Sequence, residues 1–446
     1  MLRDAHGLDL STDAPDAVRG FDHTLQGYLK YRADTAARLQ RALAADPDCG
    51  MLHVLKGSLA MLAYSRDFVA GVRDSIATAK RCTANATPRE RAHVAALAAW
   101  AEDGMDRAVP IWEQVLQDHP HDILAFRLHH FCSFWLGRAA GMASTAAAVL
   151  PLWDRGLPGY GSVLACHGFA QEECGNYGVA EAAGRAAIAL DPGDLWAAHA
   201  VAHVLEMQGR RAEGIAWVDG LSHHWEGANN LTHHLWWHCA LYHLEHRDFP
   251  RVLELYDRRF RDLDSPVTQV MPDLYIDVQN ATSMLFRLQR HGVEVGDRWV
   301  ELADKAEARI GDCLSAFTLP HWMMALAATQ RWDAAARLLA AMRDGARGNA
   351  GTVARHALPV AEAVLLHARG EHAGAVAAMR PALGGMSALG GSHAQQDVLE
   401  QLFLDAAMRA GLTGDARLAL ERAAGRYPVP PERRVGYAEA ARAVAH

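Results

Sequence analysis

Hydrophobic positions recur at intervals of three and four along almost the whole chain, which is the spacing of one face of an α-helix. Alanine and leucine are abundant, and we find no alternating run of four or more residues that turn signals bound as a strand. Two helix starts carry a capping-box pattern, Thr87 with Glu90 and Ser392 with Gln395. The pattern therefore predicts an all-α fold.

A repeat is visible in the segment CGNYGVAEAAGRAAIALDPGD, residues 174–194, which has the glycine, aromatic, alanine and proline positions of a tetratricopeptide repeat. Glycine recurs from Gly175 to Gly209, a spacing of 34 residues. Weaker copies of parts of the repeat occur at residues 40–48, 112–122, 246–258, 330–342 and 369–383. A helical hairpin buries its apolar face only against neighbouring hairpins. We therefore predict a right-handed α-solenoid of tetratricopeptide-like hairpins, curled around a central pocket.

The expected domain organisation follows from the position of the repeats and of one glycine-rich stretch. The repeat array is expected over residues 1–383, with a centre rich in histidine and tryptophan at 158–258. The sequence GGMSALGG, residues 384–391, is typical of a flexible linker. Residues 392–446 are expected to form a last helical hairpin and a capping helix.

Several blocks of the sequence together resemble the tetratricopeptide repeat protein 38-like family. They are DAHGLDLST near the start, PGYGSVLACHGFAQEECGNY, AHAVAHVLEMQGR, HHLWWHCAL and the late GSHAQQDVLEQ. The resemblance extends over essentially the full length. It implies the helical-repeat fold, and it implies no particular substrate or mechanism.

Composition and charge narrow the range of partners. The 446 residues carry a net charge of -8, which gives no electrostatic reason to expect nucleic acid or an anionic membrane. No basic start with an apolar core resembles a signal peptide, and no run of 18 apolar residues predicts a membrane span, so the expected location is the cytoplasm. Seven cysteines without a CxxC spacing indicate reduced thiols. Phosphate-binding loop motifs are absent, so no nucleotide cofactor is expected.

Nine of the 25 histidines lie between Asp194 and His246, together with five tryptophans. In the helix expected over residues 195–208, the spacing places Trp196, His199, His203 and Glu206 on one face. The helix expected over 232–245 should bring His234, Trp237 and His238 toward the same concave surface. The helix before both offers Glu172 and Glu173, with His167 nearer the packed side.

Histidine titrates near neutral pH, so this set of residues is suited to general acid-base catalysis. The leading hypothesis is a pocket that binds a small organic molecule and catalyses hydrolysis, elimination or isomerisation. Glu206 follows His203 by one turn and is expected to accept its ring N–H. The catalytic candidates are His199, His203, Glu206, His234 and His238. The ligand-binding candidates are Trp196, Trp236, Trp237, His167, Glu172, Glu173, Asp277, His321 and His393.

Three other interpretations use the same residues. In the first, the protein is a non-catalytic scaffold that binds a peptide or partner protein, although the candidate stripe lacks the cations and amides expected to pair with acidic peptides. In the second, His199, His203 and His234 bind a divalent metal such as zinc, although Ala200 follows His199 and excludes the HExxH motif. In the third, the histidines bond to neighbouring repeats and the tryptophans fill the core. The sequence is compatible with a homo-oligomer.

Two other groups of residues are interpreted structurally. Ser392, His393 and Asp397 invite comparison with a hydrolase triad, but the serine is an expected helix cap and no GxSxG elbow is present. The neighbouring histidines His129 and His130 lie in AFRLHHFCSFW, a segment dense in aromatic residues, and are expected in the core or in bonds between repeats.

Overall fold

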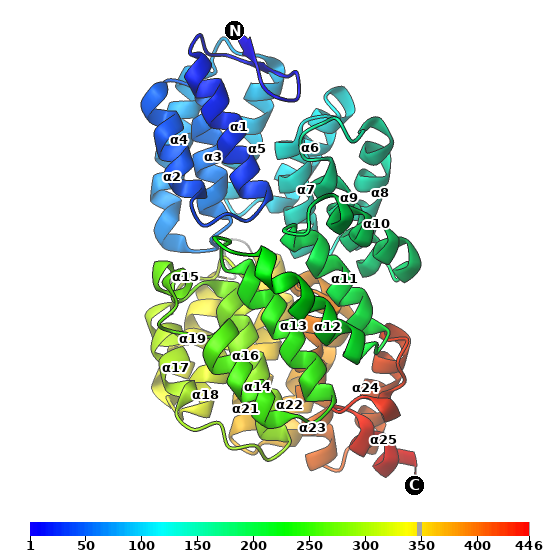
Figure 1. Ribbon diagram of the computed structural model, residues 1–446. Helices are drawn as coiled ribbons and strands as arrows, with labels where there is room; N and C mark the ends of the chain where they lie inside the picture. Colours follow the sequence, from blue (N-terminus) through cyan, green and yellow to red (C-terminus); the bar gives the residue numbers. More distant parts are fainter. Residues whose placement is uncertain (346–349, 446) are drawn as a thin grey trace. The chain divides into compact units, whose positions relative to one another are not determined.

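The computed structural model describes residues 1–345 and 350–445 of the chain. Its described residues are all-α, as predicted, apart from a short antiparallel pair of strands, β1 (Leu2–Arg3) and β2 (Asp9–Leu10). The helices form two compact units (Figure 1). Unit 1 comprises Met1–Val204 and Asp219–Thr232, and unit 2 comprises Leu205–Val218 and His233–His446.

Unit 1 is built from helical hairpins in which each helix packs against the next, as α5 does against α6 and α9 against α10. Its helices are α1 (Pro15–Leu29), α2 (Thr35–Ala45), α3 (Gly50–Met61), α4 (Val69–Cys82), α5 (Pro88–Ala101), α6 (Met105–Asp118), α7 (Ile123–Trp135), α8 (Ala139–Val149), α9 (Tyr160–Glu173) and α10 (Tyr177–Leu190). Short helices η1 (Arg66–Phe68), η2 (Leu150–Leu152) and η3 (Ser222–His224) lie in connections. The helix α11 (Leu195–Met207) belongs to unit 1 up to Val204.

Unit 2 continues the hairpins. Its helices are α12 (Arg211–Leu221, up to Val218), α13 (Leu231–Glu245, from His233), α14 (Phe249–Leu255), α15 (Pro266–Val270), α16 (Tyr275–Arg290), α17 (Arg298–Ala308), α18 (Thr318–Ala328), α19 (Trp332–Gly345), α20 (Ala350–Thr352), α21 (Leu358–Ala368), α22 (His372–Met379), α23 (His393–Arg409), α24 (Thr413–Arg426) and α25 (Ala438–Ala445). The short helices are η4 (Tyr256–Phe260), η5 (Val353–Ala357), η6 (Arg380–Leu389) and η7 (Pro431–Arg433). The helix α16 packs against α18 and α23, and α21 also packs against both, so these four helices form a closed inner set.

The turns of the hairpins explain why the repeat is clear at the centre of the sequence and weak elsewhere. Gly175 and Gly209 both have left-handed backbone conformations, with φ of +79° and +68°, as a tight helix-ending turn requires. In weaker repeats the same kind of turn contains Asp103, Arg247 or Gln330, with φ between +56° and +58°. A side chain in this conformation costs on the order of 1 kcal/mol, and hairpin packing offsets that cost. The turn of the repeat therefore has the same backbone conformation even where another residue replaces the glycine.

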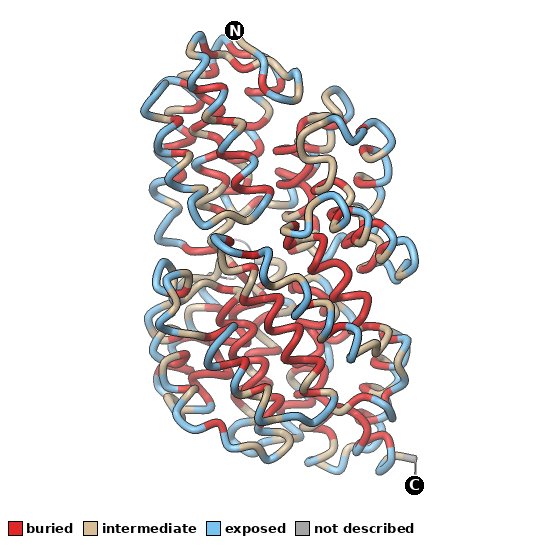
Figure 2. The backbone as a smooth tube through the Cα atoms, in the orientation of Figure 1, coloured by how far each residue is buried: buried red, intermediate tan, exposed pale blue. Residues whose placement is uncertain are grey.

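Burial follows the helices and not the turns (Figure 2). Exposed positions collect where one helix gives way to the next, whereas the inner helices are buried on most sides. In α7 every residue from Ile123 to His130 is buried, and in α16 nearly every residue is. A helix that is buried all round must bury its polar side chains as well, and these residues form the sites described below. Among the described residues, no helix is both long enough and apolar enough to cross a membrane.

Both predicted capping boxes are present, at Thr87 with Glu90 and at Ser392 with Gln395. The glycine-rich stretch 384–391 lies mostly within η6, and its role as a linker between domains stays a prediction. Met386 and Leu389 from this stretch are buried, so the apolar residues between the glycines anchor it. The two compact units divide in the region 204–233, far from that stretch. The C-terminal hairpin and helix are present as α23, α24 and α25, and His446 lies outside the described residues.

Candidate functional site

The predicted site residues are distributed over the two units. Unit 1 contains His167, Glu172, Glu173, Trp196, His199 and His203. Unit 2 contains Glu206, His234, Trp236, Trp237, His238, Asp277, His321 and His393. A single surface formed by His199 and His203 together with His234 and His238 would need both units, and it stays a prediction.

Within unit 1, α11 and α9 bring two histidines and a carboxylate into a row. The Nε2 atoms of His199 and His203 are 2.9 Å apart, and His203 Nδ1 lies 3.6 Å from an oxygen of Glu172. Glu172 and His203 are fully buried. The Phe169 ring stacks on His199 at 5.1 Å between centroids. A carboxylate, an imidazole and a second imidazole in sequence can hold or pass a proton.

The same residues of α9 and α11 include candidate ligands for zinc. Ligand atoms of Glu172, Glu173 and His203 lie within 4.8 Å of one another, and zinc accepts both atom types. The 2.9 Å between the ring nitrogens of His199 and His203 is a hydrogen-bond distance. Two nitrogens on one tetrahedral zinc would lie about 3.3 Å apart. The ring nitrogens of His199 and His203 are therefore slightly closer than two ligands of one zinc ion would be, and metal binding stays a prediction.

His167, a predicted ligand-binding residue, is half-buried on α9, and burial lowers its pKa.

Sequence reasoning missed a buried charge of unit 1, Arg127 on α7. Its Nη1 donates to Cys166 Sγ and its Nη2 donates to the Tyr31 hydroxyl, both at 2.7 Å. The rings of Tyr28, Tyr31 and Trp196 lie between 5.4 and 5.7 Å from the guanidinium carbon. Burial raises the pKa of the Cys166 thiol, so the sulfur is neutral. Within the described residues, Arg127 is 4% exposed and forms no ion pair with a carboxylate.

Polar atoms without hydrogen-bond partners gather around this arginine. They are Arg127 Nε, Trp196 Nε1 and both ring nitrogens of His130, all buried. The His130 and Trp196 rings are 5.9 Å apart, and Trp196 stacks on the partly exposed Tyr31 at 6.0 Å. Burial lowers the pKa of His130 well below its usual value, so its ring is neutral with one N–H. We call Tyr31, Arg127, His130, Cys166 and Trp196 the Arg127 cluster. Buried donors without partners are rare in native proteins and need an explanation.

Within unit 2, Glu206 bonds to His238, with 2.7 Å between its carboxyl oxygen and His238 Nδ1. The predicted bond from Glu206 to His203 would join the two units, and it stays a prediction. The partner His238 comes from α13, and helical spacing within α11 could not reveal it. Burial raises the pKa of Glu206 to about 8 and lowers that of His238 to about 3. At neutral pH the protonated carboxyl group of Glu206 therefore donates a hydrogen bond to the ring nitrogen of neutral His238. His234 Nδ1 lies 3.2 Å from Asn280 Oδ1, and Trp237 stacks on His234 at 5.2 Å.

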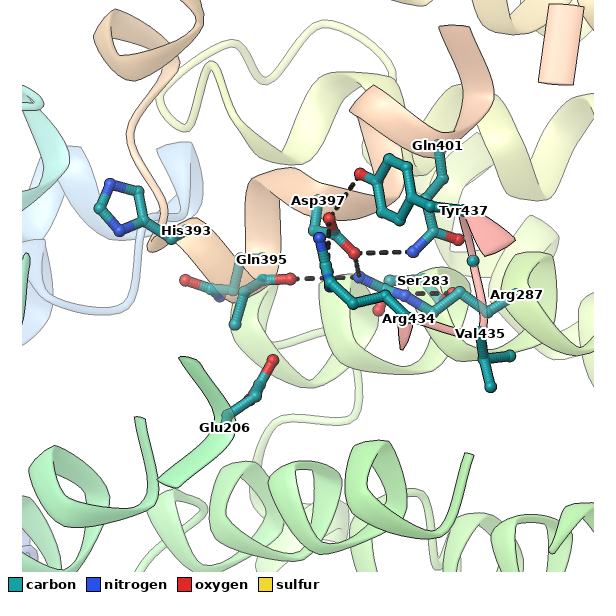
Figure 3. Close-up of polar contacts among 12 residues, drawn as sticks. Glu206, Ser283, Arg287, His393, Gln395, Asp397, Gln401, Arg434, Val435 and Tyr437 are labelled. Carbon is teal, nitrogen blue, oxygen red and sulfur yellow. Dashed lines mark hydrogen bonds and ion pairs between the residues drawn. The ribbon is translucent and has the colours of Figure 1, made fainter. Parts of the chain in front are cut away.

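Glu206 also faces a polar cavity (Figure 3). The cavity volume is about 30 Å³, which is room for one or two water molecules. Its lining includes Glu206, Arg287, Asp397 and Arg434. Asp397 accepts hydrogen bonds from Arg434 at 2.9 Å, from Tyr437 at 2.6 Å and from Gln401 at 2.7 Å. Although burial opposes it, Arg434 and Arg287 hold the pKa of Asp397 at about 2.

The other predicted ligand-binding residues of unit 2 have separate surroundings. Asp277 lies 3.1 Å from His233 Nδ1, and His321 donates from Nδ1 to the Phe317 carbonyl of its own helix at 2.8 Å. The Arg259 guanidinium lies over Trp236 at 4.9 Å. His393 is partly buried at the start of α23 and points away from Asp397 (Figure 3). Burial lowers the pKa values of His321 and His393 to about 4, so both rings are neutral near pH 7.

Comparisons with known proteins add the following. No protein-family model matches the chain. One similar solved structure is the crystal structure of the P58(IPK) TPR domain, at 11% identity and a TM-score of 0.23, covering 79% of this chain and 89% of that chain. At that identity and score, no residue role is carried over from the neighbour. The stacked hairpins themselves make the chain a tetratricopeptide-like helical-repeat protein.

Proposed function

We propose that the protein is a non-catalytic binding protein and that the Arg127 cluster of unit 1 binds a carboxylate-bearing segment of a peptide or partner protein. The observation that carries this proposal is the set of buried donors without partners, Arg127 Nε, Trp196 Nε1 and the His130 ring. Helical-repeat proteins commonly bind peptides along their repeats. The resemblance to the tetratricopeptide repeat protein 38-like family belongs to the same proposal, as do a cytoplasmic location and self-association.

The charge of Arg127 is the main attraction for a carboxylate. A buried guanidinium loses its hydration, and a thiol, a phenol and aromatic faces compensate less well than a carboxylate does. A carboxylate that displaced the Tyr31 hydroxyl would meet Nη2 and the unpaired Nε together. These two donors form the fork that binds a carboxylate with two parallel hydrogen bonds.

The aromatic members supply the rest of the contact. Tyr31 and Trp196 are partly exposed, whereas Arg127 and His130 are buried beneath them. A peptide residue next to the carboxylate would therefore lie on the Tyr31 and Trp196 rings, and the indole N–H would be a further donor. Asp194, whose carboxyl group interacts electrostatically with Arg127, already caps α11 through the backbone N–H of Ala197 at 3.0 Å. It opposes a second anion weakly, because burial raises its pKa.

The test uses an array of random octapeptides with free C-terminal carboxylates and a matched array with C-terminal amides. We expect wild-type protein to bind peptides whose signal disappears on the amide array or on replacement of an acidic side chain. Arg127→Met should weaken binding of these peptides at least about tenfold, because a charge-assisted hydrogen bond contributes about 1.5–3 kcal/mol. The exposed Arg107 of α6 provides the matched control, Arg107→Met, which should bind like wild type. Equal binding by Arg127→Met and wild type on every peptide would refute the proposal.

Acid-base chemistry on a small molecule is a second candidate, favoured by one observation. Glu206, a carboxylic acid with a pKa near 8, is bonded to His238 at the wall of a polar cavity. Such a group exchanges a proton near neutral pH. The small cavity volume is the argument against it. A panel of small esters and epoxides tests the idea: turnover should fall at least about a hundredfold in Glu206→Gln. A wild-type rate in that variant would exclude it.

A further inference from the structure

The chain between α24 and α25, residues 427–437, is a connection of bends and turns that contains the short helix η7. Residues 434–437 form a turn in which the Tyr437 N–H donates to the Arg434 carbonyl at 3.0 Å. Side chains from three helices bind its backbone as they would bind a peptide. Arg211 of α12 donates to the Arg433 carbonyl at 2.8 Å, Glu245 of α13 accepts from the Val435 N–H at 3.2 Å, and Arg290 of α16 donates to the Gly436 carbonyl at 3.3 Å. Backbone recognition by side chains holds such a segment in one register.

Two side chains of the segment anchor it to one carboxylate (Figure 3). Arg434 and Tyr437 both donate to Asp397 Oδ1. Gln401 donates to the other oxygen of Asp397, and Arg287 lies 3.7 Å from it. Arg434 and Tyr437 are 8% and 1% exposed, so the anchors are inserted and do not lie on the surface. We call Glu245, Arg287, Asp397, Arg434 and Tyr437 the Asp397 cluster.

The contacts of Arg434 and Tyr437 with Asp397 are polar and directional, as in the specific recognition of a peptide. A buried ion pair adds little net stability compared with apolar side chains of the same volume, because both charges lose their hydration. A segment that only covered the end of a repeat array would be held as well by leucines. The segment also leaves Arg434 Nη1 without a partner, next to the cavity lined by Glu206 and Glu245.

We propose that the surface formed by Glu245, Asp397, Arg211 and Arg290 is a peptide-binding site that recognises arginine followed three residues later by tyrosine. The chain's own residues 434–437 occupy it in cis, and a partner protein with an exposed Arg-x-x-Tyr segment displaces them. This site lies in unit 2 and selects a basic, aromatic peptide. It goes beyond the proposed binding of carboxylates by Arg127 and does not depend on it.

The test uses the full chain and a fluorescein-labelled synthetic peptide of residues 427–446, with binding measured by fluorescence anisotropy. Wild-type protein should bind the peptide weakly, because the cis segment competes. Arg434→Ala weakens the cis anchor and should bind the peptide at least about tenfold more tightly. The neighbouring, exposed Arg433 gives the control Arg433→Ala, which should match wild type. No gain for Arg434→Ala over wild type and this control would overturn the proposal.

Peptide variants test the recognition without altering the protein. On the Arg434→Ala chain, peptides with the single changes Arg434→Ala and Tyr437→Phe should each bind at least several-fold more weakly than the natural peptide. Equal binding of all three peptides would mean that the site does not read these side chains, and it would refute the proposal.

Discussion

Arg127 of unit 1 and Arg287 of unit 2 lie on the buried helices α7 and α16, and are 4% and 2% exposed. Arg287 donates to the carbonyls of Ser283 and Ala394 and lies 3.7 Å from Asp397. Arg127 meets a thiol, a hydroxyl and aromatic rings. The two arginines carry the same charge at the same depth, but only Arg287 has a carboxylate from its own chain.

A buried arginine can serve structure or ligand binding, and the presence of a carboxylate partner in the fold distinguishes the two roles. A cation whose counter-charge is built into the fold, such as Arg287, fixes how helices and the C-terminal segment fit together. A cation whose counter-charge is missing lowers stability, and native proteins keep such features where function requires them. On this basis the Asp397 cluster is already satisfied by the chain, whereas the Arg127 cluster awaits a ligand. The predictions below test that division.

Asp397→Ala should have the largest effect on stability. It leaves Arg287 and Arg434 buried without their shared carboxylate and removes the partner of the Tyr437 hydroxyl. We expect the free energy of unfolding to fall by about 3–5 kcal/mol in urea denaturation. Asp304 forms an exposed ion pair with Arg331, so the control Asp304→Ala should cost less than about 1 kcal/mol. Similar losses in both variants would contradict the built-in role of Asp397.

Glu206→Gln should change the pH dependence of stability. The folded-state pKa of Glu206 is raised from 4.5 to about 8 by burial, so the folded state retains a proton that the unfolded state releases above pH 4.5. Protonated Glu206 therefore contributes stability that is lost as pH rises from about 4.5 to 8, with no further loss from this group above 8. The loss is on the order of 3 kcal/mol, because each pKa unit is worth about 1.4 kcal/mol and the side chain is partly hydrated. Glutamine does not titrate, so this pH-dependent contribution to the free energy of unfolding should be absent from the variant.

Urea denaturation of both proteins at intervals from pH 4.5 to 9 measures this effect. The two curves should meet near pH 4.5, with the variant more stable at pH 9. The exposed Glu432 supplies the control Glu432→Gln, which should keep the wild-type slope. Parallel curves for Glu206→Gln and wild type would show that Glu206 ionises normally in the folded protein.

The fold was predictable from the sequence because its determinants are local and repeated. The three-four spacing of apolar residues, the glycines at 175 and 209, and the capping residues Thr87 and Ser392 each act within a few residues of themselves. The same holds for His199 and His203, which meet because they lie one turn apart on α11. Contacts between residues that are close in the sequence can therefore be predicted from the sequence.

The remaining features of the sites depend on pairs that are distant in the sequence. Glu206 finds His238 across 32 residues, and Arg127 finds Tyr31 across 96. No spacing rule predicts such partners, because they depend on which hairpin faces pack together. One signal was available: Arg127 is a single charge in the apolar segment ILAFRLHHF, and a charge in a helix buried all round must have a specific environment.

Arg127→Met should have the smallest effect on stability and is the sharpest test of the comparison. Methionine fills a similar volume and removes a buried charge that has no carboxylate partner, so the free energy of unfolding should stay the same or rise by up to about 1 kcal/mol. Arg89 is the matched control in unit 1, because it is equally buried but lies 2.7 Å from Asp122. Arg89→Met should lose about 3–5 kcal/mol, since it removes the guanidinium from a buried carboxylate that then keeps its bonds to His93 and to the Ala125 N–H. If urea denaturation showed an equal loss for Arg127→Met, the arginine would be a structural member of the fold, and the carboxylate-binding proposal would lose its basis.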